Sequence, residues 1–191
     1  MVRNRFFWYT PVLTSQDLLM SQPLYDFSVP VFVKALTNLK AQLVKAEAFC
    51  AEKKIEEATL LQVRLAIDML PFVKQVQIAS DNAKGTAARL VGIEPPKMED
   101  SEKSLAELVV RIDKTLAFLT TFKPEQFSVA AGTQIRLPYF PEKHFLGGEF
   151  LPEYGLPNFF FHVVTAYAIL RHVGMDIGKA DYMGSVSMYN D

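Results

Sequence analysis

Residues 60–92 constrain the fold most, because they are expected to form one long helix that carries a polar stripe within an apolar face. At about 100° per residue, five polar side chains fall in one narrow sector of the helix wheel. They are Arg64, Asp68, Gln75, Asn82 and Arg89. Polar groups on a buried face are costly unless each finds a partner, so the pattern predicts a helix that faces polar groups across a core. Pro71 removes a hydrogen-bond donor and predicts a kink within this helix.

Three further segments show helical periodicity. Residues 29–53 repeat apolar side chains every three to four positions. A second stripe runs from residue 101 to 124, where Ser104 and Glu107 have the spacing of a capping box. Residues 157–174 are apolar nearly all round, which predicts the most buried helix. Together the segments predict an all-α, antiparallel four-helix bundle.

A change of pattern separates the third and fourth predicted helices. Residues 133–137 alternate polar and apolar side chains, as a half-buried strand does. Residues 144–151 contain a Gly-Gly pair and are a candidate for the returning strand. This region is therefore expected to form a short β-hairpin or an ordered loop.

Charge and composition exclude several classes of function. The chain of 191 residues has 20 Lys and Arg against 21 Asp and Glu, for a net charge of −1. This balance provides neither the basic field that nucleic acids require nor a polybasic patch for a membrane surface. No apolar run reaches the roughly 18 residues of a membrane-spanning helix. Cys50 is the single cysteine, so no intramolecular disulfide can form, and we expect a cytoplasmic protein.

The length fits one domain with appendages. Residues 1–21 show no clear period and are expected to be an N-terminal extension outside the core. They imitate a signal peptide, but Pro11 interrupts the apolar run and no A-x-A site follows. Residues 22–184 are expected to form the bundle, and residues 185–191 a C-terminal tail.

His162 is the ionisable side chain in the apolar middle of the fourth predicted helix, and it is the centre of the candidate site. Asp68 and Gln75 are seven residues apart, nearly two turns, so they share a face of the second helix. We expect both to meet His162 near the Pro71 kink, with Arg64 beside them as a further ligand-binding residue. Asp68 and His162 are the candidate catalytic residues, because a carboxylate can orient an imidazole that acts as a base.

The same residues also have a structural interpretation. A buried network of Asp68, Gln75 and His162 could fix helix register without binding a ligand. Arg64 and Asp68 have the i, i+4 spacing of an ion pair within a helix. A metal centre needs about three converging ligands, and Ala166 stands one turn after His162, so no second histidine follows there. We therefore expect no metal site and no cofactor, with a divalent metal as the alternative.

Four blocks of sequence resemble a known superfamily. They are YDFSVPVF, RLAIDMLPFVKQVQIASD, LPNFFFHVVTAYAILRHVG and IGKADYMG. In this order, over about residues 22–184, they resemble an uncharacterised branch of the DinB-like, or YfiT-like, four-helix-bundle superfamily. The resemblance implies a DinB-like bundle that pairs through its helices as a homodimer.

Other branches of this superfamily include metal-dependent transferases and hydrolases. Their site uses one histidine on helix two and an HxxxH pair on helix four. In this chain Asp68 or Gln75 takes the first place, His162 takes one place of the pair, and Ala166 takes the other. The chain therefore departs from the metal-binding pattern of the superfamily.

Three hypotheses for function follow, and they leave open whether the chain is an enzyme. The first is a bundle that binds a small molecule in a core pocket near the kink, through Arg64, Asp68, Gln75 and His162. The second is a metal-dependent transferase or hydrolase with an altered ligand set. The third is a non-catalytic, structural or stress-associated bundle. The expected partners are a small molecule and a second copy of the chain, without nucleic acid or membrane.

Overall fold

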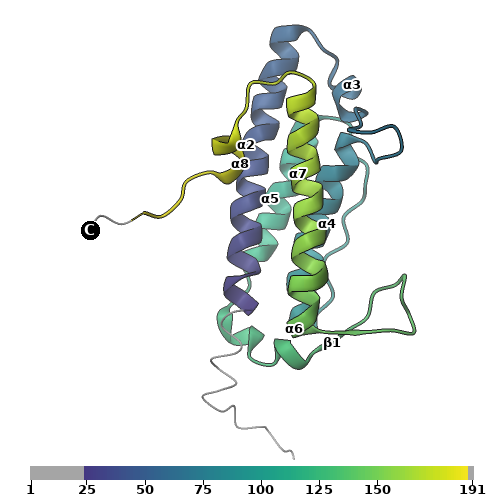
Figure 1. Cartoon of the computed structure of the whole chain (residues 1–191), viewed down its shortest axis with the longest axis vertical. Coiled ribbons are helices and arrows are strands. Elements are labelled where there is room, and N and C mark those ends of the chain that lie inside the picture. The colour runs from purple at the N-terminus through teal and green to yellow at the C-terminus, as the bar shows by residue number, and fades with distance from the viewer. Residues whose placement is uncertain (1–23, 189–191) are drawn as a thin grey trace, which may run out of the picture.

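In the computed structural model, which describes residues 24–188, four long helices lie side by side along one axis (Figure 1). They are α2 (Val29–Lys53), α4 (Phe72–Leu90), α5 (Leu105–Leu119) and α7 (Leu156–His172). The predicted all-α bundle is confirmed. The extension expected for residues 1–21 lies outside the described part of the chain, as does the end of the expected tail, residues 189–191.

The direction of the helices follows from a long crossover between α4 and α5. Residues 91–104 return along the bundle, so that Asp100 forms an ion pair of 2.9 Å with Lys74 in the first turn of α4. Helices α4 and α5 therefore run in the same direction, whereas the closely packed pairs α2–α5 and α4–α7 are antiparallel (Figure 1). Because α4 and α7 are neighbours, polar side chains on their facing sides can meet.

Two helices have the limits or caps that the sequence predicted. Helix α2 spans residues 29–53 and ends where Lys54 adopts a left-handed backbone with φ of 55°. Helix α5 begins later than predicted, at Leu105, directly after its N-cap Ser104. There the Ser104 hydroxyl accepts a hydrogen bond of 3.2 Å from the backbone N–H of Glu107.

The prediction of one long helix over residues 60–92 is wrong. The segment forms the short helix α3 (Glu57–Leu61) and then α4, with residues 62–71 as a loop between them. Pro71 is the N-cap of α4, with an extended ψ of 166°, and not a kink inside a helix. Proline drives the preceding residue out of the helical region. A backbone hydrogen bond of 2.8 Å, from Phe72 N to Val63 O, then closes the loop.

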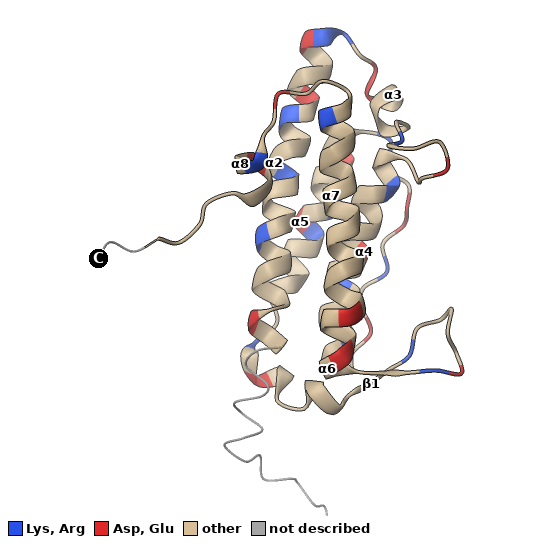
Figure 2. Ribbon diagram, viewed as in Figure 1, with Lys and Arg blue, Asp and Glu red and all other residues tan. Residues whose placement is uncertain are grey.

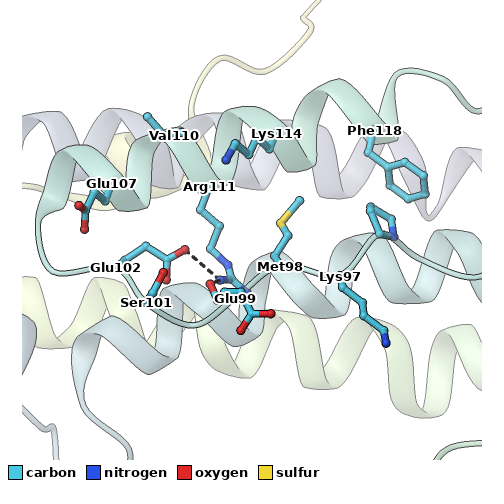
Figure 3. Close-up of a pocket in the computed structure, with 11 residues that line it drawn as sticks. Lys97, Met98, Glu99, Ser101, Glu102, Glu107, Val110, Arg111, Lys114 and Phe118 are labelled. Carbon is cyan, nitrogen blue, oxygen red and sulfur yellow. Dashed lines mark hydrogen bonds and ion pairs between the residues drawn. The ribbon is translucent and has the colours of Figure 1, made fainter.

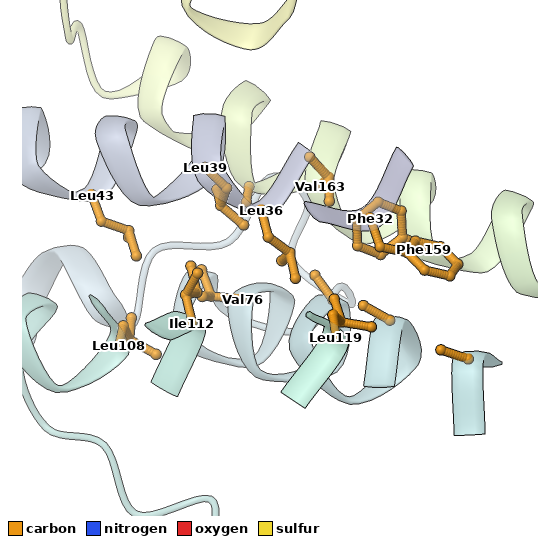
Figure 4. Close-up of a cluster of buried hydrophobic side chains, with 14 of the residues drawn as sticks. Phe32, Leu36, Leu39, Leu43, Val76, Leu108, Ile112, Leu119, Phe159 and Val163 are labelled. Carbon is orange, nitrogen blue, oxygen red and sulfur yellow. The ribbon is translucent and has the colours of Figure 1, made fainter. Parts of the chain in front are cut away.

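Apolar stripes from the long helices fill the core, as Figure 4 shows for one part of it. The buried side chains labelled there are Phe32, Leu36, Leu39 and Leu43 of α2, Val76 of α4, Leu108, Ile112 and Leu119 of α5, and Phe159 and Val163 of α7. The rings of Phe32 and Phe159 meet edge to face, with centroids 4.8 Å apart. Burying one such side chain contributes roughly 1.5–3 kcal/mol, so this core fixes the positions of the faces that α4 and α7 turn to each other.

The segment between α5 and α7 is irregular at first and then forms a hairpin. Two single turns, η1 (Pro124–Phe127) and η2 (Ala130–Gly132), lead into strand β1 (Gln134–Ile135). This strand pairs antiparallel with β2 (Phe145–Leu146). The short hairpin predicted between the third and fourth long helices is confirmed.

A continuous helical run follows the hairpin. It consists of α6 (Gly147–Phe150), the π-helical turn η3 (Leu151–Gly155) and α7. After α7 the chain turns back, and α8 (Lys179–Met183) packs against α2. Basic and acidic residues are interspersed along the helices, in keeping with the small net charge (Figure 2). Within residues 24–188, the helices are all too short or too polar to cross a membrane.

Candidate functional site

Gln75 and His162 meet between α4 and α7, as the sequence predicted. Gln75 lies in the first turn of α4, and His162 lies in the second turn of α7. Both side chains are buried, with 1% and 8% of their surface exposed. The Oε1 atom of Gln75 and the Nδ1 atom of His162 are 2.7 Å apart. A hydrogen bond therefore joins the two helices across the core.

The Gln75 amide sets the proton position on the imidazole. Its Nε2 atom donates a hydrogen bond of 2.8 Å to the backbone carbonyl of Leu70, at the end of the loop before α4. This contact turns Oε1, which can only accept, toward His162. Nδ1 of the imidazole must therefore carry the proton and donate it to Gln75. In the neutral ring, Nε2 is then left as an acceptor with a free lone pair.

Burial keeps this imidazole neutral. Desolvation lowers the pKa of His162 below its ordinary value, because the charged form loses its hydration in the core. Among residues 24–188, no side chain or backbone group forms a hydrogen bond with its Nε2 atom. The ring of Phe161 stands edge-on to the imidazole, with centroids 5.1 Å apart. The site therefore presents an oriented, uncharged base.

Asp68 and Arg64 lie elsewhere. Both are exposed on the loop of residues 62–71. Arg64 donates a hydrogen bond of 2.6 Å to the carbonyl of Met69, and in the described part of the chain it forms no ion pair with Asp68. Asp68 has no hydrogen bond to Gln75 or His162 within residues 24–188. The convergence expected for Asp68 fails because α4 begins after Pro71, so Asp68 shares no helix face with Gln75.

The arrangement does not fit a metal centre of the kind that the superfamily uses. Within the described residues, no group of three or more His, Cys, Asp or Glu side chains lies close enough to hold a metal ion. His162 offers one nitrogen, and Ala166 on the next turn of α7 offers no ligand. The Oε1 atom of Gln75 is already used as the acceptor for His162.

A second polar cluster, around Arg111 of α5, was missed at the level of sequence. The side chain of Arg111 is almost fully buried and contacts three carboxylates. These are Glu102 at 2.9 Å, Asp81 at 2.8 Å and Asp100 at 3.0 Å. The buried Lys84 also pairs with Asp81, at 2.7 Å. The sequence indicated this cluster only through Arg111, a charged side chain on an otherwise apolar helix face, because the partners of Arg111 come from other elements.

The Arg111 cluster borders a groove between the crossover and α5, with a volume of about 750 Å³ (Figure 3). Burial disfavours the charged form of Glu102, but hydrogen bonds from Arg111 and Gln77 outweigh it and lower the pKa of this carboxyl. Burial likewise acts against the guanidinium charge of Arg111. The hydrogen bond to Glu102 and the negative charges of Asp81, Glu102 and Asp100 together outweigh burial and raise the pKa of Arg111. The cluster thus fastens the crossover to α4 and α5, which is a structural role.

Another polar group lies where the last turn of α4 meets the start of α7. Arg89, from the predicted polar stripe, is half-buried in the last turn of α4. Its charge acts on Tyr154 of η3, whose hydroxyl contacts that of Tyr139 from the hairpin loop. Burial first, and then the contact with Tyr139, raise the pKa of Tyr154 to about 12. Asn82, between Gln75 and Arg89 on the stripe, is half-buried.

Comparisons with known proteins agree with the architecture. The family described as a domain of unknown function, DUF1993, matches residues 24–183. The crystal structure of a DinB family member protein from Shewanella denitrificans superimposes with a TM-score of 0.87 at 44% sequence identity. The similarity covers 91% of this chain and 99% of that one. A search of curated proteins finds no match.

Proposed function

This chain belongs to the DUF1993 family of domains of unknown function, and we propose that it is a DinB-like bundle that binds a small molecule at Nε2 of His162. The observation that carries the proposal is the hydrogen-bond chain from Leu70 O through Gln75 to Nδ1 of His162. Each link orients the next, so the lone pair on Nε2 has a fixed direction.

The chemistry of the site defines the class of ligand. A neutral imidazole with a free Nε2 accepts a hydrogen bond, so the ligand is a donor such as an alcohol, a thiol or a protonated ring nitrogen. The edge-on ring of Phe161 and the apolar surroundings of α7 favour a ligand with an apolar body. An oriented neutral imidazole is also suited to take a proton from a bound hydroxyl or thiol.

A structural interpretation is supported by a different observation. Gln75 and His162 are nearly fully buried, and together they tie the end of the loop at Leu70 to α7. In that interpretation the pair fixes the register of α4 against α7, and Nε2 meets water only. The two interpretations differ in whether Nε2 responds to a ligand.

The test is NMR of protein labelled with ¹⁵N in histidine. The free protein should show His162 as the tautomer with the proton on Nδ1. Titration with a panel of small alcohols, thiols and azoles should shift the Nε2 resonance of His162 saturably for at least one compound. His172, which is exposed on the same helix, serves as the control and should not shift.

The variant Gln75→Leu gives a second arm. It removes the acceptor for Nδ1, so both tautomers should appear and the ligand should bind more weakly. If no compound shifts Nε2 saturably, or if the tautomer carries its proton on Nε2, the binding proposal is refuted. Loss of stability in Gln75→Leu without any ligand response in the native chain would support the structural interpretation.

A further inference from the structure

Two lines of polar side chains run along the contact between α4 and α7. On α4 the line is the part of the predicted polar stripe that follows Pro71, namely Gln75, Asn82 and Arg89. On α7 and the π-helical turn before it, the line consists of His162, Asn158 and Tyr154. Because α4 and α7 are antiparallel neighbours, both lines lead away from the Gln75–His162 hydrogen bond in the same direction (Figure 1).

The fold provides partners for Gln75 but not for the rest of the line on α4. In the described part of the chain, Asn82 forms no hydrogen bond, and Arg89 forms neither a hydrogen bond nor an ion pair. Both side chains are half-buried, so each keeps part of its surface open to solvent. A half-buried cation has lost part of its hydration and is costly without a partner. The position of Arg89 therefore favours an anion from outside the chain.

The guanidinium of Arg89 lies one turn back along α4, toward the start of the helix. A Cβ atom at position 85 would overlap a terminal nitrogen of this group, so the guanidinium covers the bare backbone of Gly85. The next residue, Thr86, packs against Gly155, where an added Cβ would lie 2.8 Å from the Thr86 methyl group. Tyr154 directly precedes Gly155, and the charge of Arg89 acts on it. The guanidinium is therefore placed at the edge of the α4–α7 contact, beside Tyr154.

Tyr154 adds a hydroxyl that stays protonated. Burial first, and then the contact with Tyr139, raise the pKa of Tyr154 to about 12. The two hydroxyls share one proton between them, so the other proton is left to donate, whereas a phenolate would repel an anion. Asn158, which interacts with Tyr154, stands one turn before His162, about 6 Å along α7. Donors for an anion are thus close to the imidazole along the same helix.

We propose that the small molecule bound at Nε2 of His162 carries a carboxylate or phosphate group, which Arg89 and Tyr154 bind. This inference rests on the proposed function and adds the acidic end of the ligand. The planar fork of a guanidinium matches the paired oxygens of such groups, and its charge strengthens each hydrogen bond. Ten residues of α4, about 15 Å, separate Gln75 from Gly85. The ligand is therefore an extended acid, with its hydrogen-bond donor at one end and its anionic group at the other.

The experiment compares three series of compounds with chains of about six to twelve carbon atoms. They are ω-hydroxy carboxylic acids, ω-hydroxyalkyl phosphates and the uncharged diols of the same length. Binding is followed by the ¹⁵N resonance of Nε2 of His162 and by the amide chemical shifts of residues 82–89 and 154–158. At the matching length, an acid or a phosphate should shift both sets of resonances together. It should bind about tenfold or more tightly than its diol, as gain of a charge-assisted hydrogen bond allows, and the two charged series distinguish a carboxylate site from a phosphate site.

Four variants assign this preference to its residues. Arg89→Gln should abolish the preference for the charged compound over its diol and leave the affinity for the diol unchanged. Gly85→Ala, which displaces the guanidinium, should also reduce the preference, and it replaces Arg89→Gln if that variant fails to fold. Tyr154→Phe should reduce the preference less, because it removes an uncharged donor. Lys34→Gln, which removes an exposed positive charge on α2, is the matched control and should keep the full preference.

The possible results separate this inference from the proposed function. If diols shift Nε2 of His162 saturably but the charged compounds bind no more tightly, the inference is overturned and the proposed function stands. If no compound shifts Nε2 saturably, both are refuted, even where the amides of residues 82–89 respond. An undiminished preference in Arg89→Gln, or in Gly85→Ala where Arg89→Gln does not fold, also overturns the inference.

Discussion

Replacing Arg111 with methionine should destabilise the fold chiefly through the carboxylate of Glu102. The side chain of Glu102 is only 11% exposed, whereas those of Asp81 and Asp100 are 40% exposed. Asp81 and Asp100 also keep Lys84 and Lys74 as partners. Removing one member of a buried ion pair costs about 3–5 kcal/mol when the other is left without compensation. Glu102 loses its guanidinium and keeps the hydrogen bond from Gln77 as partial compensation, so we expect a loss of about 3 kcal/mol, at the lower end of this range.

A double variant separates this cause from loss of packing. Methionine keeps most of the volume of the Arg111 stem, so Arg111→Met with Glu102→Gln removes both charges and should regain at least about 1 kcal/mol relative to Arg111→Met alone. Urea unfolding at pH 7 measures both values, with an unchanged slope expected. A loss below about 1 kcal/mol in the single variant, or no recovery in the double variant, would refute the reasoning.

The pH dependence of the native chain provides an independent check. Since the folded-state pKa of Glu102 is lowered, the stability it contributes is present above the ordinary pKa of a glutamate. That stability is lost as the pH falls through the folded-state value. The loss of stability on acidification should be smaller in Arg111→Met, because Glu102 then has no guanidinium to stabilise its negative charge.

Three other predictions address α4 and α7. Gly85→Ala should raise the free energy of unfolding by about 0.5–1 kcal/mol, because alanine is the better helix former and the three atoms nearest to its Cβ belong to the movable end of Arg89. A melting temperature at or below that of the native chain would contradict this. The pKa of His162 is lowered by burial, so the unfolded chain binds its proton first and stability should rise with pH from the folded-state value up to about 6.5. NMR titration and urea unfolding check this, and a slope of opposite sign in that range would be inconsistent with a buried neutral ring. Protein purified without added metal should contain no stoichiometric zinc or nickel by elemental analysis; one equivalent per chain, lost in His162→Ala, would overturn the prediction.

The sequence by itself determined those features that depend on local periodicity. The limits of α2, the N-cap at Ser104 and the short hairpin follow from side chains a few residues apart. The contact between Gln75 and His162 was also predictable, because a buried amide on one helix and a lone histidine in the apolar middle of another each need a partner.

Tertiary structure decided the features whose partners are distant in the chain. Periodicity placed Asp68 on the same face as Gln75, but proline restricts the residue before it, and the chain between α3 and α4 closes into a loop instead. The crossover of residues 91–104 brings Asp100 and Glu102 to Arg111, and the hairpin and the π-helical turn bring Tyr139 and Tyr154 together near Arg89. A helix wheel gives the direction of a side chain from its own axis, whereas the group that the side chain meets depends on how the helices pack, and that is set by the core as a whole.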